Sequence, residues 1–138
     1  MLVWRFKTLT LPNGRNDVQS EIDGYDDYAR EAFSRAISHL SVTPKNEWQS
    51  PQAKKLKGED PIYEIRYQAN KRQTRALGYF ENDEQTFVIV LICFHKGRVY
   101  HPADAFKSAH KKIDRISAGT AHTAPLQILG EDFPADEG

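Results

Sequence analysis

Basic and histidine side chains gather in the middle of the chain, in an order that suits the binding or cutting of a polyanion. Two arginines, Arg66 and Arg75, lie on consecutive strand-like runs, and a third run is followed by His95, Lys96, Arg98 and His101. The planar fork of arginine holds two phosphate oxygens and stays charged at any working pH. Neighbouring antiparallel strands are about 4.8 Å apart. We therefore expect Arg66 and Arg75 to reach one phosphate together.

These residue types could cut RNA without a metal. The 2′-hydroxyl of RNA can attack the adjacent phosphate if the site supplies a proton acceptor, a cation for the extra negative charge and a proton donor for the leaving oxygen. Histidine serves either proton role near neutral pH. The candidates are His101 and His95 for the proton transfers, Arg75 and Arg98 for charge stabilisation, and Lys96 for either. Arg66 is a further catalytic candidate through the phosphate that it shares with Arg75. Tyr67, Tyr100 and His95 are expected to contact substrate, the tyrosines by stacking on a base.

Three strand-like runs have to position these side chains, namely residues 62–69, 74–81 and 86–94. All are rich in β-branched and aromatic residues and are separated by short turn-forming stretches at 70–73 and 82–85, which predicts an antiparallel meander. Alternation in the first run places Tyr63, Ile65 and Tyr67 on one face and Glu64 and Arg66 on the other. The third run is apolar on both faces, which predicts a strand at the centre of the sheet.

The remaining elements surround this meander. Residues 2–11 alternate as a strand and stop at Pro12, and residues 16–40 have helical periodicity broken near Gly24, with Asp26 and Asp27 as candidate N-caps of a second helix. Residues 41–57 are expected to form a loop. Pro102 is expected to open a last helix that runs to Ile116. The sequence thus predicts an α+β fold.

The chain from residue 117 onward is expected to be extended and acidic, without a regular element. It contains one apolar patch that we expect to fold back on the domain or to meet a partner, formed by Leu126, Ile128, Leu129 and Phe133.

Length and composition limit the possible folds and functions. A chain of 138 residues suits one domain. The 19 basic and 19 acidic residues balance, but residues 45–116 hold 14 Lys and Arg against 9 Asp and Glu, so neutrality hides a basic centre. The single cysteine, Cys93, lies in the most apolar run and is expected to be a buried thiol. The histidines lack a metal-ligand spacing, so no metal and no cofactor are expected. No apolar run fits a signal peptide or membrane span, and we expect a soluble cytoplasmic protein.

The order of elements and several motifs resemble the RelE/HigB-like toxin superfamily, in particular its phage-derived branch. Tyr63 and Arg66 match a tyrosine-x-x-arginine strand, and Arg75 matches the arginine of the next strand. A third motif of that branch fits Phe94, Lys96, Pro102 and Ala109. Three departures are Gly97 in place of a second lysine, Ala105 in place of an acidic residue, and a loop at 70–74 without its usual glycine.

The resemblance implies a RelE-like toxin domain over residues 1–116, followed by a tail over 117–138. It implies the toxin of a type II toxin–antitoxin pair, which cleaves mRNA on the ribosome without a metal and is neutralised by an antitoxin, expected to be of helix-turn-helix type. The roles carry over for Arg66, Arg75 and Lys96, and by extension for Arg98 and His101.

Two other functions remain open. The first keeps the fold and drops RNA cleavage, as in a gyrase-directed toxin or a degenerate member that only binds an antitoxin or nucleic acid. The second is a nucleic-acid-binding module of a mobile element. Near-neutral charge and Gly97 favour both alternatives, whereas the convergence of Arg66, Arg75, Lys96 and His101 favours the nuclease.

Overall fold

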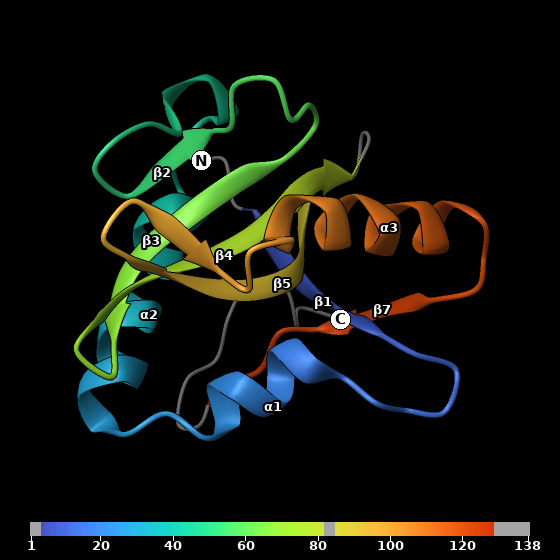
Figure 1. Ribbon diagram of the computed structural model, residues 1–138, viewed down its shortest axis with the longest axis horizontal. Coiled ribbons are helices and arrows are strands. Elements are labelled where there is room, and N and C mark those ends of the chain that lie inside the picture. The colour runs from blue at the N-terminus through green and yellow to red at the C-terminus, as the bar shows by residue number, and fades with distance from the viewer. Residues whose placement is uncertain (1–3, 82–84, 129–138) are drawn as a thin grey trace.

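The fold is α+β, as the sequence predicts. The computed structural model describes residues 4–81 and 85–128 (Figure 1). Within those residues, seven strands form one mixed sheet in the order β2-β3-β4-β5-β1-β7, with β6 paired to β5. The long middle strands are β3 (Tyr63–Ala69), β4 (Arg72–Glu81) and β5 (Thr86–Lys96). They form the expected antiparallel meander, and β5 lies inside the sheet between β4 and β1.

The amino-terminal part begins with β1 (Arg5–Thr10), which pairs parallel to β5. Two helices follow, α1 (Asp17–Asp23) and α2 (Asp27–Ser41), and they are separated at Gly24 as the sequence predicts. The side chains of Asn16 and Asp26 accept hydrogen bonds from backbone N–H groups in the first turns and so fix where each helix starts.

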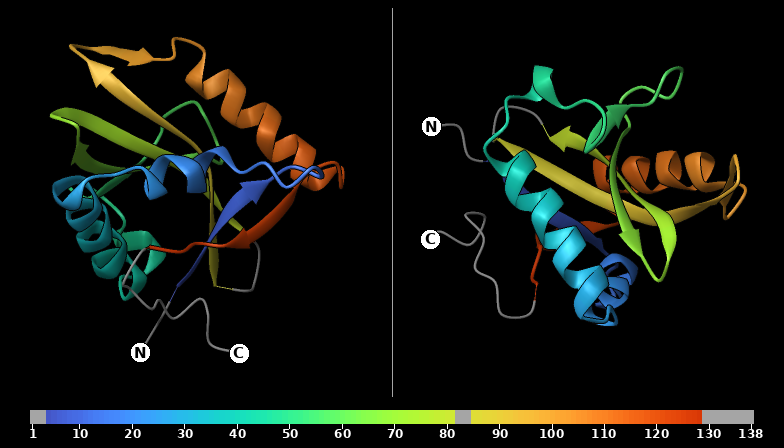
Figure 2. Two further views of the ribbon diagram at one scale, coloured as in Figure 1. Left: turned by 90° about the horizontal axis from the view of Figure 1, so that it is seen from below. Right: turned by 90° about the vertical axis from the view of Figure 1, so that its left-hand side faces the viewer.

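The sheet separates two apolar layers, with α1 and α2 on one face and α3 (Ala105–Ser117) on the other (Figure 2). Large aromatic residues dominate the layer under α1 and α2, among them Phe6, Phe33, Trp48 and Phe87. The layer under α3 is smaller and mostly aliphatic. Cys93 is buried in this second layer, as predicted. We call these two sides the α1–α2 face and the α3 face.

The segment 41–57 is more ordered than the sequence suggests. It holds a 3-10 turn at Lys45–Glu47 and the short strand β2 (Ala53–Lys55), which pairs with the start of β3. Trp48 is 3 % exposed and lies among the aromatic rings of the α1–α2 face. One buried indole therefore anchors a stretch whose prolines and polar residues predicted only a loop.

The last helix begins at Ala105 and not directly at Pro102, whose carbonyl oxygen instead accepts a hydrogen bond from the N–H of Ala105. Beyond this helix the chain forms β7 (His122–Pro125), which pairs antiparallel to β1. No sequence pattern predicted this strand. Leu126 and Ile128 are buried in the α1–α2 layer, so this part of the apolar patch does fold back. Leu129 and Phe133 lie outside the described residues, as does most of the expected turn at 82–85.

Two hairpin turns end the meander side by side. The β3–β4 turn consists of Asn70 and Lys71, both with positive φ, as a two-residue hairpin turn requires. The β5–β6 turn leads into β6 (Val99–His101) and contains Gly97, also at positive φ. Glycine adopts that conformation at little cost, which gives a backbone reason for Gly97 at the position where the resemblance leads us to expect a second lysine. Because Gln73 lies opposite His95 in the sheet, the two turns are neighbours.

Candidate functional site

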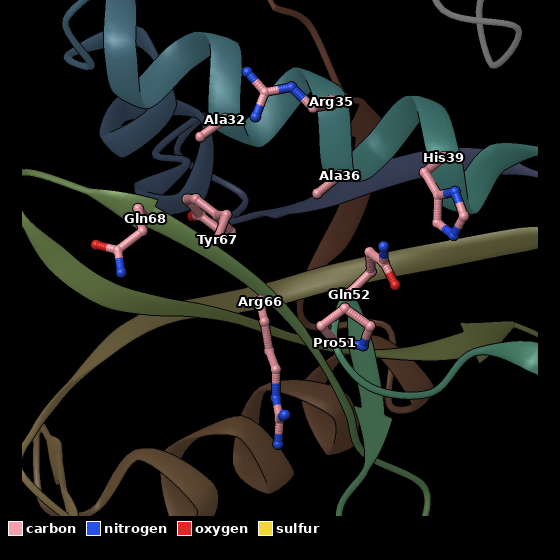
Figure 3. Close-up of a pocket in the computed structure, with 9 residues that line it drawn as sticks. All are labelled: Ala32, Arg35, Ala36, His39, Pro51, Gln52, Arg66, Tyr67 and Gln68. Atoms are coloured by element: carbon pink, nitrogen blue, oxygen red, sulfur yellow. The ribbon is translucent and has the colours of Figure 1, made fainter.

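Alternation along β3 decides which predicted site residues can meet. Arg66 and Tyr67 are consecutive and point to opposite faces of the sheet, Tyr67 toward α2 and Arg66 away from it (Figure 3). Tyr67 is 7 % exposed, and its hydroxyl group shares a hydrogen bond of 2.7 Å with that of Tyr25. The ring is part of the core, so the structure does not place Tyr67 where a base could stack on it.

On the α3 face the two predicted arginines do converge. Arg66 and Arg75 are directly opposite each other on β3 and β4. Between them lies a carboxylate, Glu64, whose side chain is 1 % exposed. Its Oε2 accepts a hydrogen bond from Arg66 Nε at 2.8 Å and is 3.5 Å from Arg75 Nε. The arginines therefore hold an internal anion at the place where we expected a phosphate.

Tyr100 completes this arrangement from β6. Its hydroxyl donates to Glu64 Oε1 at 2.5 Å, and its ring packs against Phe106 of α3. Burial, and after it the contact with Glu64, raises the pKa of the Tyr100 hydroxyl above its ordinary value. We name the four residues Glu64, Arg66, Arg75 and Tyr100 the Glu64 cluster. Its two cations face one carboxylate, and Arg75 has only 10 % of its side chain exposed.

A second basic region lies at the end of the sheet, between the two hairpin turns. It is a hollow of about 550 Å³, which we name the tip groove, and it is lined by Lys71, Arg72, Gln73, Phe94, His95, Lys96, Gly97 and His101. None of the described residues that line it is a carboxylate. Three lysine or arginine side chains and two histidines thus share one open surface.

Of the predicted residues, Lys96, His95 and His101 belong to this tip groove. His101 lies opposite Phe94 on the α1–α2 face, whereas His95 lies opposite Tyr100 on the α3 face. The groove reaches both because it passes the end of the sheet. Arg98 is exposed in the adjoining turn and is not among the lining residues. The sheet therefore separates His101 from Arg66 and Arg75, and the single hollow expected from the sequence is divided in two.

His95 is set apart by its environment. Its Nε2 atom is buried and has no hydrogen-bond partner among the described residues. Its ring packs edge to face against that of Tyr100, with ring centres 4.0 Å apart. Burial lowers the pKa of His95, and the positive charge of Arg75 lowers it further. The lowered pKa favours the neutral form of His95, which is able to accept a proton.

Sequence reasoning missed three residues of these surfaces, namely Glu64, Arg72 and Lys71. Lys71 lies in the β3–β4 turn and Arg72 is the first residue of β4, and the sequence assigned both only to turn chemistry. Arg72 lies over the Phe94 ring, with its guanidinium carbon 4.3 Å from the ring centre. Their signal was available, since a two-residue turn brings both side chains beside the end of the next hairpin.

Two further observations concern metal ions and membranes. Within the described residues 4–81 and 85–128, no group of three His, Cys, Asp or Glu side chains is placed to hold a metal ion. Over the same part of the chain, the helices are too short or too polar to cross a membrane.

Comparison with known proteins identifies the family. The model of the phage-derived, Gp49-like proteins (DUF891) matches residues 20–115, which is more than half of the chain. The chain therefore belongs to the Gp49-like family, a phage-derived family of HigB/RelE-like toxins. No curated protein and no solved structure matches it significantly.

Proposed function

We propose that the chain is the toxin of a type II toxin–antitoxin pair and cleaves mRNA on the ribosome without a metal. The observation that supports this most is the tip groove, where cations and two histidines line one open hollow and none of its described lining residues is acidic. A polyanion gains most from such a surface, because exposed cations without an acidic partner have no ion pair to give up when they bind phosphate. In this proposal the protein acts in the cytoplasm, where ribosomes and mRNA are.

The reaction follows from the chemistry of RNA. The 2′-oxygen attacks the neighbouring phosphorus, the bond from phosphorus to the 5′-oxygen breaks, and the products are a 2′,3′-cyclic phosphate and a 5′-hydroxyl. His95, whose lowered pKa favours the neutral form, takes the proton of the 2′-hydroxyl. His101 gives a proton to the departing 5′-oxygen, and Lys96 and Arg72 stabilise the additional negative charge. Arg66 and Arg75 act indirectly: their contacts with Glu64 hold β3 and β4 in place, and their positive charges lower the pKa of His95.

The test is inducible expression in bacteria with mapping of new mRNA 5′ ends. The wild-type chain is expected to arrest growth and to create 5′-hydroxyl ends inside codons of translated mRNA. Replacing His95 or His101 by glutamine should lower cleavage by roughly 10²- to 10⁴-fold, the usual contribution of a general acid or base. The matched control is His122→Gln, which changes an exposed histidine on β7, away from the groove. Cleavage unaffected by both groove variants would overturn the assignment.

A second function has an observation of its own. The Glu64 cluster occupies both arginines that the family resemblance assigns to catalysis, and Gly97 contributes no side chain to the groove. A toxin-fold protein that acts by binding an antitoxin, nucleic acid or gyrase fits these facts. Growth arrest with DNA damage and without new mRNA ends would support this function and exclude the first.

The partner follows from the class. A toxin of this family implies an antitoxin, and we propose a small helix-turn-helix protein that neutralises it. Coexpression of the neighbouring gene should restore growth, and co-purification of the two chains should show the complex.

A further inference from the structure

A second, smaller hollow adjoins the tip groove on the α1–α2 face. Its volume is about 260 Å³, and it shares Arg72, Phe94 and His101 with the groove. Its remaining walls come from α1, the β3–β4 turn and the middle of the sheet, and include Glu21, Asn70 and Thr74. Pockets for drug-sized ligands begin near roughly 300 Å³. This hollow is therefore suited to one small ring system, and not to a folded chain.

The side of the hollow that it shares with the groove is built from three stacked planar groups, those of Arg72, Phe94 and His101. The rings of Phe94 and His101 are almost parallel, at 14°, with centres 5.3 Å apart. The guanidinium of Arg72 lies 4.3 Å from the centre of the Phe94 ring. Because β4 and β6 flank β5 on opposite sides, Arg72 and His101 cover Phe94 from both sides, and the planes left open to a ligand are those of Arg72 and His101. Flat rings and guanidinium planes of this kind are the surfaces on which proteins stack unpaired bases, because every base has a π-face.

The rest of the lining includes polar side chains. Glu21 of α1 lines it with a carboxylate, which only accepts hydrogen bonds when ionised, and Asn70 lines it with an amide, which both donates and accepts. Thr74 is 4 % exposed, and its hydroxyl donates a hydrogen bond to the carbonyl oxygen of Arg72 at the start of β4. A base stacked on Arg72 or His101 inside the hollow would have Glu21 and Asn70 in the same lining as hydrogen-bonding partners for its edge.

We propose that this hollow seats one unpaired base of the RNA whose backbone lies in the tip groove, and that it favours bases with an exocyclic amino group. The inference rests on the proposed function, since it takes RNA as the substrate. Adenine, cytosine and guanine each offer an amino group to the Glu21 carboxylate. Uracil has none: the one donor of its pairing edge, N3–H, lies between two carbonyl oxygens, both of which the carboxylate would repel. A site built for a hydrogen bond discriminates strongly against a ligand that lacks it.

The experiment measures the binding of fluorescent single-stranded hexamers, oligo(rA) and oligo(rU), to the full chain by anisotropy at one salt concentration. The wild type should bind oligo(rA) roughly tenfold more tightly than oligo(rU). Glu21→Ala should reduce this ratio to near one. The matched control is Asp23→Ala, which removes the same charge from the same helix at an exposed residue that does not line the hollow. It should leave the ratio unchanged, whatever it does to both affinities.

A second variant tests the stack formed by Arg72, Phe94 and His101. Phe94→Ala removes the ring between Arg72 and His101 and should weaken the binding of oligo(rA) more than that of oligo(rU). Circular dichroism should confirm that the variant folds. If wild type binds both oligonucleotides equally, or if Glu21→Ala and Asp23→Ala change the ratio alike, the base pocket is excluded while RNA binding in the groove still stands. If neither oligonucleotide binds, RNA binding by the isolated chain fails and the pocket fails with it.

Discussion

Two basic regions of the sheet contain similar residues in different environments. In the Glu64 cluster, two arginines share a buried carboxylate, and the side chains of Arg66 and Arg75 are only 26 % and 10 % exposed. In the tip groove, Lys71, Arg72 and Lys96 are exposed, and the described lining residues include no acidic partner. Charges that are buried and paired act mainly inside the protein. Exposed charges without an acidic partner remain available to a ligand.

The Glu64 cluster has a structural role that follows from this difference. Glu64 joins three strands, because it contacts Arg66 on its own strand, Arg75 on β4 and Tyr100 on β6. These strands carry the two turns that form the groove. The buried charges therefore hold the strands that shape the groove, and the exposed ones are those that we propose to bind RNA.

The largest expected effect comes from breaking the cluster. Glu64→Ala leaves two partly buried guanidinium groups without their anion, and removal of one partner of a buried pair costs about 3–5 kcal/mol. Arg66 keeps some solvent contact, so we expect a decrease of about 3 kcal/mol in the free energy of unfolding, measured by urea denaturation. The control is Glu31→Ala, which breaks an exposed pair with Arg35. It should cost less than about 1 kcal/mol.

An equal, small decrease in the two variants would show that the Glu64 cluster is not the structural charge centre. Its arginines would then be as free to bind phosphate as the lysine and arginine side chains of the groove, and the contrast between the two regions would disappear.

The next effect tests the groove. The double variant Arg72→Gln, Lys96→Gln should weaken single-stranded RNA binding and reduce the salt dependence of log K by about 1.4, or roughly 0.7 for each phosphate that is no longer neutralised. The control is Lys54→Gln, Lys57→Gln, which removes two exposed lysines near β2, away from the groove. Equal salt slopes in wild type and the groove variant would contradict the assignment of phosphate binding to this hollow.

Much of this arrangement could be predicted from the sequence. Alternation along 62–69 placed Tyr63, Ile65 and Tyr67 on the packed face, and the break at Gly24 separated the two helices. Tyr67 was nevertheless also assigned to the substrate. The same alternation already excluded this, because a ring on the packed face is not available to stack on a base.

The remaining errors concern features that local patterns do not carry. A charged residue between Tyr63 and Ile65 suggests a solvated position, and the burial of Glu64 depends on Tyr100 of β6, which is far along the chain. The division of the expected hollow depends on one turn. Because Lys96 pairs with Val99, His101 lies opposite Phe94 and so falls on the face away from Arg75. β7 shows no alternation of its own and is held by pairing with β1.

The smallest effect connects the two regions. Burial lowers the pKa of His95 first, and the charge of Arg75 second, so His95 needs a pH below its ordinary range to become protonated. Arg75→Met removes that positive charge and keeps an apolar stem, and the His95 pKa should therefore rise toward its ordinary value. Arg66→Gln should raise it less, since Arg66 contributes less. NMR titration of the His95 ring protons measures both, with the exposed His122 as internal reference. If neither variant changes the His95 pKa, the Glu64 cluster supports the groove by shape alone. The acidic limb of a plot of cleavage rate against pH should then be the same in both variants as in wild type.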